Sequence, residues 1–333
     1  MTRQTEEAAV PATMLAALPD DDGRLRPRKL PVPEAGPGEV LVRVHAAGVN
    51  RADTLHARGR YTQASRPAGA PNVAGMELAG EVVAAGGPVE GALLGSRVMA
   101  MHPGSYAEYA VVDARLLLPV PDALPIVDAA ALPMGLMTGF DALVALAGAT
   151  PGETCVVTGA TSGVGLVGVQ LAMLLGLDVI ATTRSAASVP VLEALGVRHI
   201  ATSAEEAAAL RPDGIDIVLD HVGGDLLAGL LNSLASGARV VSVGRLGGGS
   251  VAVELNAFAG RRACLIGTTW RTRGVDEIAA VAQRLAAYGG GLEVRPVLAV
   301  VVPFDRIDGL LEVIEAPHAP GKLVVSLLDE GSN

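Results

Sequence analysis

The pattern of hydrophobic and polar positions changes character once along the chain. Between about Met14 and Asp122 the apolar runs are short, and glycine or proline separates them. In EVLVRVHAAGV the residues Val40, Val42 and Val44 alternate with other positions, which predicts a half-buried strand. ELAGEVVAAGG, GSRVMAM and YAEYAVVDARLLLPVP follow, with turns between them. Several short strands of this kind predict an all-β, barrel-like module.

From about Leu124 onward, strands alternate with helical patterns. TCVVT precedes a segment in which Val164, Val167, Leu171 and Leu174 recur at spacings of three and four, which predicts a helix. DVIATT, IDIVLD, ARVVSVG and ACLIGTT read as further strands with helical stretches between them. This alternation predicts an α/β domain with a doubly wound parallel sheet. The last helix and strand, in PFDRIDGLLEVIEAPHAPGKLVVSLL, are expected to return to the first module.

Composition fits two domains with aliphatic cores. The chain has 333 residues, 50% of them hydrophobic and only 2% aromatic. The two cysteines, Cys155 and Cys264, lie in apolar runs, so both are expected to be buried. Two cysteines exclude a disulfide framework, and we expect a cytoplasmic protein.

Charge and hydropathy exclude several function classes. The net charge of −10 is a poor match for nucleic acid and would repel anionic membranes. No unbroken apolar run of about 18 residues occurs, so we expect no membrane span. The first ten residues, MTRQTEEAAV, contain no apolar core, so they are expected to form a ragged end rather than a signal peptide.

The stretch VVTGATSGVGLVGVQLA carries the clearest candidate chemistry. Its strand should end near Thr158, and a helix follows the turn. At the first strand-to-helix turn of a doubly wound sheet, unpaired backbone N–H groups and the helix dipole suit a pyrophosphate. The small residues allow its close approach, and the alternative is a tight turn without a ligand. The candidate residues are Gly159, Ala160, Thr161, Ser162, Gly163, Val164 and Gly165.

A literal G-x-G-x-x-G occurs at Gly163, Gly165 and Gly168, but it would begin inside the helix. We therefore assign the turn to G-A-T-S-G-V-G and expect Gly168 to serve helix packing.

The end of the second strand indicates which nucleotide would bind. NAD requires an acid there for its ribose hydroxyls, and ATTRSAAS contains none. Thr183, Arg184 and Ser185 lie about twenty residues past the turn, where a cation and hydroxyls suit a 2′-phosphate. We therefore expect NADPH. The alternative is that Arg184 is a solvated surface arginine.

These motifs, with AAGVNRADTLHARGRY, GMELAGEVV, YAEYAVV, LPMGLMTGFDAL, DIVLDHVGG and GTTWRTR, resemble the medium-chain dehydrogenase/reductase family. The resemblance is to its zinc-independent quinone oxidoreductase branch and covers nearly the whole chain. It implies an α/β protein with a GroES-like β-barrel-type domain, formed by residues 1–124 and 300–333. A Rossmann domain, residues 125–299, would bind NADPH.

The residue types argue against a catalytic metal. Zinc-using relatives carry a cysteine in the first motif and Gly-His-Glu in the second, where this chain has Asn50 and Gly75-Met76-Glu77. A thioether is a poor zinc ligand. Two cysteines cannot form the four-cysteine lobe of those relatives. The histidines His45, His56, His102, His199, His221 and His318 show no ligand spacing.

The resemblance implies hydride transfer from NADPH to a quinone or an activated C=C bond, with hydrogen bonds stabilising the developing charge. Asn50 and Thr138 match family positions near the cofactor, and Tyr61, which closes the GRY element, would donate its phenol proton or a hydrogen bond. Each has another interpretation: Asn50 as a turn cap, Tyr61 as a packing residue, Thr138 as a helix-interior hydroxyl.

GTTWRTR lies past the last parallel strand, where the fold opens toward ligands. Trp270 is the only tryptophan, and it would form a flat wall for a planar substrate or pack in a subunit interface. Arg271 and Arg273 would bind an anionic group or remain solvated. The further cofactor residues expected are Val222, Gly244, Gly267, Thr268 and Thr269.

Departures from the family leave the substrate open. Leu55 stands where some quinone reductases have a tyrosine, Ser203 stands where a tyrosine is common, and a lysine common after the second strand is absent. The alternatives are an enoyl-thioester or biosynthetic tailoring reductase and a non-catalytic NADPH-binding sensor. The apolar edge near RACLIGTT predicts a homodimer, as the family implies.

Overall fold

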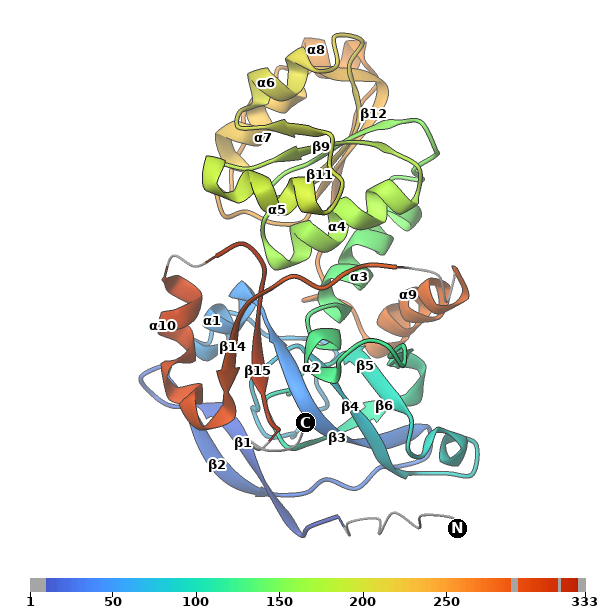
Figure 1. The fold of residues 1–333 in the computed structure, drawn as a ribbon, viewed down its shortest axis with the longest axis vertical. Helices are drawn as coiled ribbons and strands as arrows, with labels where there is room; N and C mark the ends of the chain where they lie inside the picture. The colour runs from blue at the N-terminus through green and yellow to red at the C-terminus, as the bar shows by residue number, and fades with distance from the viewer. Residues whose placement is uncertain (1–9, 289–292, 317–318, 329–333) are drawn as a thin grey trace.

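The computed structural model describes residues 10–288, 293–316 and 319–328. It consists of two units, each built around its own sheet and stacked along the long axis (Figure 1). The predicted α/β fold class is confirmed. The ragged start expected for residues 1–9 and the last histidine, His318, lie outside the described residues.

The lower unit in Figure 1 is rich in β-structure and uses both ends of the chain. Its main sheet has the order β14-β15-β3-β4-β5-β7, with β6 also paired to β3, and β1 and β2 form a separate pair. Its strands are β1 (Thr13–Pro19), β2 (Leu25–Pro31), β3 (Glu39–Val49), β4 (Glu77–Ala85), β5 (Arg97–Met101), β6 (Tyr109–Asp113), β7 (Leu118–Pro119), β14 (Leu298–Pro303) and β15 (Lys322–Ser326).

Strand β15 brings the C-terminal segment back to the centre of this unit. It pairs antiparallel with β3, with Leu323 opposite Val49, and parallel with β14. The predicted return of the last helix and strand is therefore observed. Because β3 ends at Val49, this pairing places the start of β15 beside the residues that follow β3.

The upper unit has a parallel sheet in the order β10-β9-β8-β11-β12-β13, with helices on its faces (Figure 1). The strands are β8 (Thr154–Val157), β9 (Asp178–Thr182), β10 (His199–Ala201), β11 (Ile215–Asp220), β12 (Leu234–Ser242) and β13 (Cys264–Gly267). The helices are α4 (Gly163–Leu174), α5 (Val189–Ala194), α6 (Ala204–Ala209), α7 (Gly224–Leu231) and α8 (Leu255–Gly260). The strand order changes direction between β8 and β11, and α4 follows β8 directly.

The remaining helices cover the lower unit or join the two. They are α1 (Arg51–Ala57), α2 (Ile126–Ala129), α3 (Pro133–Phe140), α9 (Val275–Tyr288) and α10 (Leu310–Glu315). A π-helical turn, η3 (Asp141–Leu146), continues α3. Short 3-10 turns are η1 (Glu90–Leu93), η2 (Ala114–Leu116), η4 (Ala186–Ser188) and η5 (Phe304–Gly309).

Residues 126–146, which span α2, α3 and η3, are long and apolar enough to cross a membrane by length and composition, with a mean hydropathy of 1.6. However, 83% of an 18-residue stretch within this segment is buried inside the protein, where α3 packs against α4. Its apolar character is therefore accounted for by core packing.

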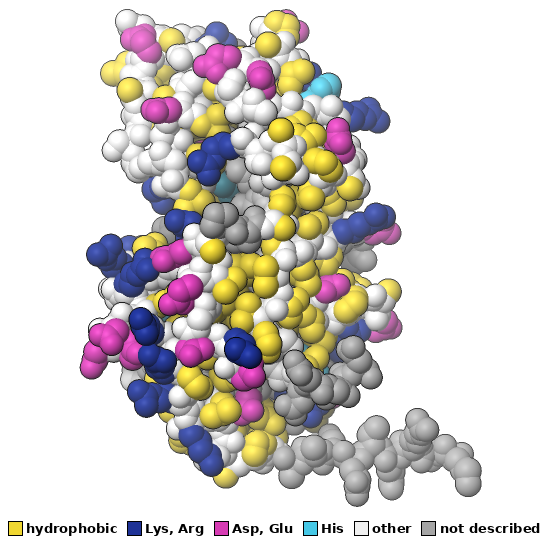
Figure 2. Space-filling model, turned by 60° about the vertical axis from the view of Figure 1, so that its left-hand side comes forward, with side chains coloured by type: hydrophobic (Ala, Val, Ile, Leu, Met, Phe, Trp, Pro, Cys, Tyr) yellow, Lys and Arg dark blue, Asp and Glu magenta, His cyan; other side chains and the backbone are white. Residues whose placement is uncertain are grey.

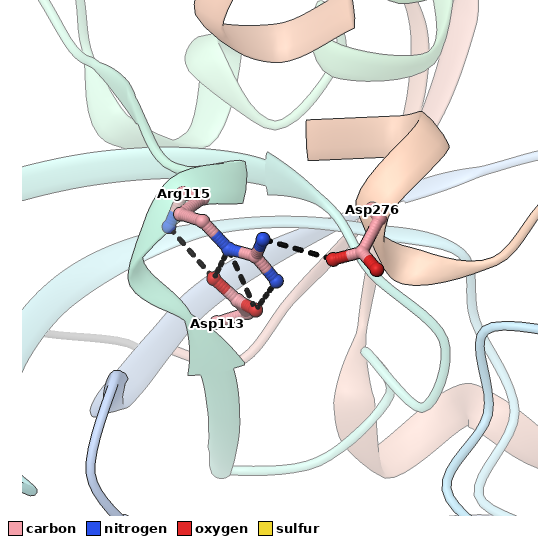
Figure 3. Close-up of polar contacts among 3 residues, drawn as sticks. All are labelled: Asp113, Arg115 and Asp276. Atoms are coloured by element: carbon pink, nitrogen blue, oxygen red, sulfur yellow. Dashed lines mark hydrogen bonds and ion pairs between the residues drawn. The ribbon is translucent and has the colours of Figure 1, made fainter. Parts of the chain in front are cut away.

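An exposed charge cluster ties α9 to the lower unit. Arg115, in η2, donates to Asp113 at 2.7 Å and to Asp276, in the first turn of α9, at 2.9 Å (Figure 3). These two carboxylates raise the pKa of Arg115. The helix that follows the parallel sheet thus lies against the β-rich unit.

One burial expectation is wrong. Cys155 is buried in β8, but Cys264 is exposed. Cys264 begins β13, which is an edge strand of the parallel sheet in the described chain. Its apolar run therefore reflects an uncovered edge rather than the core.

Candidate functional site

A cavity of about 430 Å³ lies between the two units and draws residues from both. From the lower unit and α3 it is lined by Val49, Asn50, Arg51, Ala52, Tyr61, Met76, Met134, Thr138, Asp141, Ile314, Gly321, Lys322 and Leu323. From the upper unit it is lined by Gly159, Ser162, Gly163, Val164, His221, Val222, Val243, Gly244, Arg245, Leu246, Thr268, Thr269 and Trp270. The location between domains is typical of ligand sites.

The glycine turn forms one side of this cavity. β8 ends at Val157 and α4 begins at Gly163, so the literal G-x-G-x-x-G does begin inside the helix. Gly159 has a φ of +58°, a left-handed conformation that favours glycine. A Cβ on Gly165 would lie 2.3 Å from the carbonyl oxygen of Gly159, so only glycine lets the turn close on the helix.

The turn presents a backbone donor to the cavity. Ser162 caps α4, because its Oγ accepts a hydrogen bond from Gly165 N at 3.0 Å. An isolated parallel bridge between Ser162 and Gly321 engages the N–H group of Gly163, and Gly321 N donates to Thr161 O at 3.2 Å. Among the described residues, the N–H group of Val164 makes no hydrogen bond. Gly163 and Val164 line the cavity at the positive end of the α4 dipole. This cradle fits the pyrophosphate of a dinucleotide.

Buried polar contacts hold the turn against the neighbouring strands. Asp220, at the end of β11, accepts hydrogen bonds from Thr158 Oγ1 at 2.7 Å and from Gly223 N at 3.0 Å. His221 Nδ1 lies 2.9 Å from the carbonyl oxygen of Thr158, which can only accept. Burial lowers the pKa of His221, so its ring is neutral near pH 7, with Nε2 as an acceptor that has no partner among the described residues.

The residues expected to read the ribose lie outside the cavity lining. Thr183 is buried, and its Oγ1 accepts from Ser185 N at 3.3 Å. Arg184 is exposed and has no ion pair within the described chain. Ala160 N donates to Thr182 O at 3.1 Å, so this strand end adjoins the glycine turn.

A buried polar triangle forms the opposite side of the cavity. Lys322 Nζ lies 2.5 Å from Glu77 Oε1 and donates to Asn50 Oδ1 at 2.7 Å. Asn50 Nδ2 donates to the same Glu77 oxygen at 2.7 Å. The side chains of Glu77 and Lys322 are 0% and 5% exposed. Because the ammonium only donates, it fixes which way the Asn50 amide faces.

These residues do not fit a zinc ion. The second oxygen of Glu77 accepts from Met134 N at 2.7 Å, so both of its oxygens are engaged. An ammonium already neutralises this carboxylate and would repel a dication. Met76 and Met134, which line the cavity nearby, offer only thioethers. The described part of the chain contains no cluster of three His, Cys, Asp or Glu side chains that could hold a metal.

Asp53 binds the backbone of Asn50. Its Oδ2 accepts from Asn50 N and from the hydroxyl of Tyr106, each at 2.7 Å. Asn50 is thus the N-cap residue of α1, as its alternative interpretation had it, and also lines the cavity. Burial raises the pKa of Asp53 to about 6, against the opposing effect of these hydrogen bonds.

Thr138 and Trp270 meet in the cavity lining. Trp270 Nε1 donates to Thr138 Oγ1 at 2.9 Å. The guanidinium of Arg273 lies 4.4 Å from the centre of the Trp270 ring and donates to Asp141 Oδ2 at 2.7 Å. Arg273 was expected to bind an anionic group or to remain solvated. Both expectations are wrong, because its guanidinium is engaged by Asp141 and Trp270.

Tyr61 lies beneath the segment that follows β13. The guanidinium of Arg271 lies 5.6 Å from the centre of the Tyr61 ring, and Ala64 N donates to Arg271 O at 3.0 Å. Burial raises the pKa of Tyr61, with Arg271 opposing it, so the phenol is protonated near pH 7. Arg271 is exposed and does not line the cavity, although it was expected to contact substrate.

The structure brings most of the expected site residues together. Those that line the cavity are Asn50, Tyr61, Thr138, Gly159, Ser162, Gly163, Val164, Val222, Gly244, Thr268, Thr269 and Trp270. Those outside its lining are Ala160, Thr161, Gly165, Thr183, Arg184, Ser185, Gly267 and Arg271. Ala160 and Gly165 are buried beneath the turn, because their backbone shapes it.

Sequence reasoning did not identify five polar residues of the cavity. These are Arg51, Asp141, His221, Arg245 and Lys322. The role of Glu77 as the counter-ion of Lys322 was missed as well. Lys322 had a detectable signal, since it is one of two lysines in the chain and stands in the apolar strand KLVVS. A lysine there requires a buried acidic partner.

Comparisons with known proteins agree with this architecture. The model of the alcohol dehydrogenase GroES-like domain matches residues 36–122, and that of the zinc-binding dehydrogenase domain matches residues 163–287. A thermostable alcohol dehydrogenase from Pyrobaculum aerophilum superposes with a TM-score of 0.76 at 30% identity, over 94% of this chain and 99% of the other. A mycobacterial protein solved in complex with NADPH has a TM-score of 0.78 at 26% identity, over 94% and 99%.

Curated relatives are of several kinds. A polyketide synthase of Streptomyces halstedii is 37% identical over 62% of this chain, which spans only 4% of that protein. Prostaglandin reductase-3 of Bos taurus is 36% identical over 66% of this chain and 59% of its own length. Quinone oxidoreductase-like protein 2 of Bos taurus is 29% identical over 87% and 86%. The chain belongs to the medium-chain dehydrogenase/reductase family, in its quinone oxidoreductase branch.

Proposed function

We propose that this protein is an NADPH-dependent, zinc-independent reductase that transfers hydride to a quinone or an α,β-unsaturated carbonyl. One observation carries the proposal. A single cavity joins the glycine turn to Asn50, Tyr61 and Thr138, while Lys322 already neutralises the Glu77 carboxylate beside them. The cavity therefore offers a dinucleotide cradle and hydrogen-bond donors without a metal.

The residues of the chain would bind and orient the reactants. Reduced nicotinamide, when bound, supplies the hydride. The free N–H group of Val164 and the positive end of the α4 dipole would hold the pyrophosphate. Negative charge then develops on the substrate oxygen, and the hydroxyls of Tyr61 and Thr138 can donate to it. The Tyr61 phenol keeps its proton near neutral pH because burial raises its pKa.

The preference for NADPH rests on the end of β9. Arg184 is exposed and unpaired within the described residues, two positions after Thr182, whose carbonyl bonds the glycine turn. A 2′-phosphate bound there would gain a charge-assisted hydrogen bond. The NADPH-complexed mycobacterial relative supports the choice of cofactor.

The first test is oxidation of NADPH, followed by its absorbance, against a panel of quinones, enones and enoyl thioesters, with NADH in parallel. Turnover of a quinone or enone with NADPH is expected. No turnover with any electrophile, although NADPH binds, would contradict the reductase and favour a nucleotide sensor.

Replacing Arg184 tests the cofactor preference separately. Arg184→Ala should lower the NADPH-over-NADH ratio of kcat/KM roughly tenfold, because one charge-assisted hydrogen bond is lost. Arg198→Ala, at another arginine of the same unit, is the matched control and should leave the ratio unchanged. Equal use of NADH by the wild-type protein would show that the argument from Arg184 is wrong.

A second candidate function is reduction of an enoyl thioester. The observation that favours it is the identity of 37% with a polyketide synthase segment. The same panel decides between the two, since preferential turnover of the enoyl thioester would replace the quinone or enone.

A further inference from the structure

The hydrogen bond between Trp270 and Thr138 joins the two units at the cavity, and only one of the two side chains can be its donor. An indole N–H can only donate, so Thr138 Oγ1 uses a lone pair for Trp270 at 2.9 Å. Among the described residues, the Thr138 hydroxyl donates to no acceptor of its own. Its proton is therefore left for a group that the protein does not supply.

Neighbouring side chains hold the Trp270 indole in the orientation that donates to Thr138. Arg273 covers one face of the Trp270 ring at 4.4 Å and is itself bonded to Asp141 Oδ2 at 2.7 Å and to Thr268 Oγ1 at 3.0 Å. The side chain of Asp141 is only 6% exposed. Buried charge-assisted hydrogen bonds of this kind fix a side chain far better than exposed ones.

The hydroxyl of Thr138 lies where a ligand would need it. Thr138 is 4% exposed, so its proton is shielded from bulk water, yet the residue lines the cavity. An unsatisfied buried donor is unfavourable, and a ligand oxygen would relieve it. Accepting a hydrogen bond from Trp270 also polarises the hydroxyl and strengthens its own donation.

We propose that Trp270 is a positioning residue that makes the hydroxyl of Thr138 donate to a carbonyl oxygen of the ligand bound in the cavity. The inference deepens the proposed function and rests on it. Two ligand groups share this chemistry: the carboxamide of the nicotinamide and the carbonyl of the substrate. The distinction between them is left to the experiment.

The test is a double-mutant cycle on the full chain. Trp270→Phe keeps a flat ring but removes the N–H, Thr138→Val removes the hydroxyl, and Thr138→Ser restores it. Thr272→Val is the matched control, because Thr272 is exposed in the same segment and has no side-chain hydrogen bond in the described structure. The Kd of NADPH is read from nicotinamide fluorescence, and kcat/KM is measured at saturating NADPH.

The expected result is non-additivity. Thr138→Val should raise the Kd of NADPH or lower kcat/KM roughly tenfold to a hundredfold, and Trp270→Phe about three- to tenfold. The double variant should match Thr138→Val alone, because Trp270 then has no hydroxyl to orient. Thr138→Ser should stay near the wild type. A weakened NADPH Kd identifies the carboxamide, and a lower kcat/KM with unchanged Kd identifies the substrate carbonyl.

Additive losses, or a serine variant as impaired as the valine variant, would overturn the inference and leave Trp270 as packing. If no electrophile is turned over, the proposed function fails, but the cycle is still read from the NADPH Kd. In that case a Kd unchanged in both single variants would overturn the inference too.

Discussion

Lys322 shows how a single residue can determine what chemistry a cavity allows. Its ammonium and the Glu77 carboxylate are both buried and contact each other, and each also hydrogen-bonds to Asn50. A buried ion pair contributes little net stability, but removing one partner leaves an uncompensated charge. The pair therefore fixes the position of Asn50 rather than simply strengthening the fold.

Lys322→Met should lower the free energy of unfolding by about 3–5 kcal/mol, because Glu77 is then left buried and unpaired. Urea denaturation measures it. The double variant Lys322→Met, Glu77→Gln is the control and should recover much of the loss, since neither charge remains. A single variant as stable as the wild type would contradict the buried pair.

Asp53 predicts a pH effect on stability. Its folded-state pKa of about 6 exceeds the ordinary value of 3.8, so between those values the folded chain holds a proton that the unfolded chain has released. Stability from this group is thus present below about pH 4 and lost as the pH rises through about 6.

Asp53→Asn should therefore gain stability relative to the wild type by roughly 3 kcal/mol between pH 4 and pH 7. Urea denaturation of both proteins at each pH measures the difference, in which the other titrating groups cancel. A difference that does not change with pH would show that the Asp53 carboxyl is not perturbed.

At the scale of elements, the glycine turn between β8 and α4 is the part that local sequence specifies best. Gly159 supplies a left-handed φ, Ser162 caps the helix, and Gly165 allows the close approach of the Gly159 carbonyl. All three are local requirements within seven residues, so the residue types alone predicted the turn.

Gly165→Ala should weaken NADPH binding roughly tenfold or more and destabilise the protein by about 1–3 kcal/mol, because its Cβ would press on the Gly159 oxygen. Isothermal titration and thermal unfolding measure the two effects. Gly260→Ala is the control, since nothing lies within 4 Å of the added Cβ. Unchanged NADPH affinity in Gly165→Ala would mean that the turn does not hold the cofactor.

At the scale of the whole molecule, β13 is an exposed edge of the parallel sheet. Leu265 on this strand is 46% exposed and Cys264 is exposed as well. On the face drawn in Figure 2, basic and acidic side chains are interspersed around hydrophobic areas. Pairing β13 with the same strand of a second copy would cover the apolar edge.

We therefore expect a homodimer in sedimentation, and Leu265→Arg should shift it toward the monomer, because it places a charge on the paired edge. Leu174→Arg is the control, since Leu174 is 48% exposed at the end of α4, away from that edge. A wild-type monomer at micromolar concentration would contradict the predicted dimer.

The sequence by itself determined the elements and the turn, because those depend on near neighbours. The alternation of Val40, Val42 and Val44 and the helical spacing after Gly163 report local burial, and the strands and helix form there. The small residues of the turn were readable for the same reason. Residue types also argued against zinc, since Met76 stands in place of a histidine.

Only the tertiary structure decided which distant side chains meet. Lys322 reaches Asn50 and Glu77 because β15 returns to pair with β3, a contact across 272 positions for Asn50. Trp270 reaches Thr138 because the segment after β13 crosses to α3. Cys264 is exposed because its strand is an edge, although its apolar run read as core. Such contacts depend on sheet order and domain stacking, and local periodicity carries no information about either.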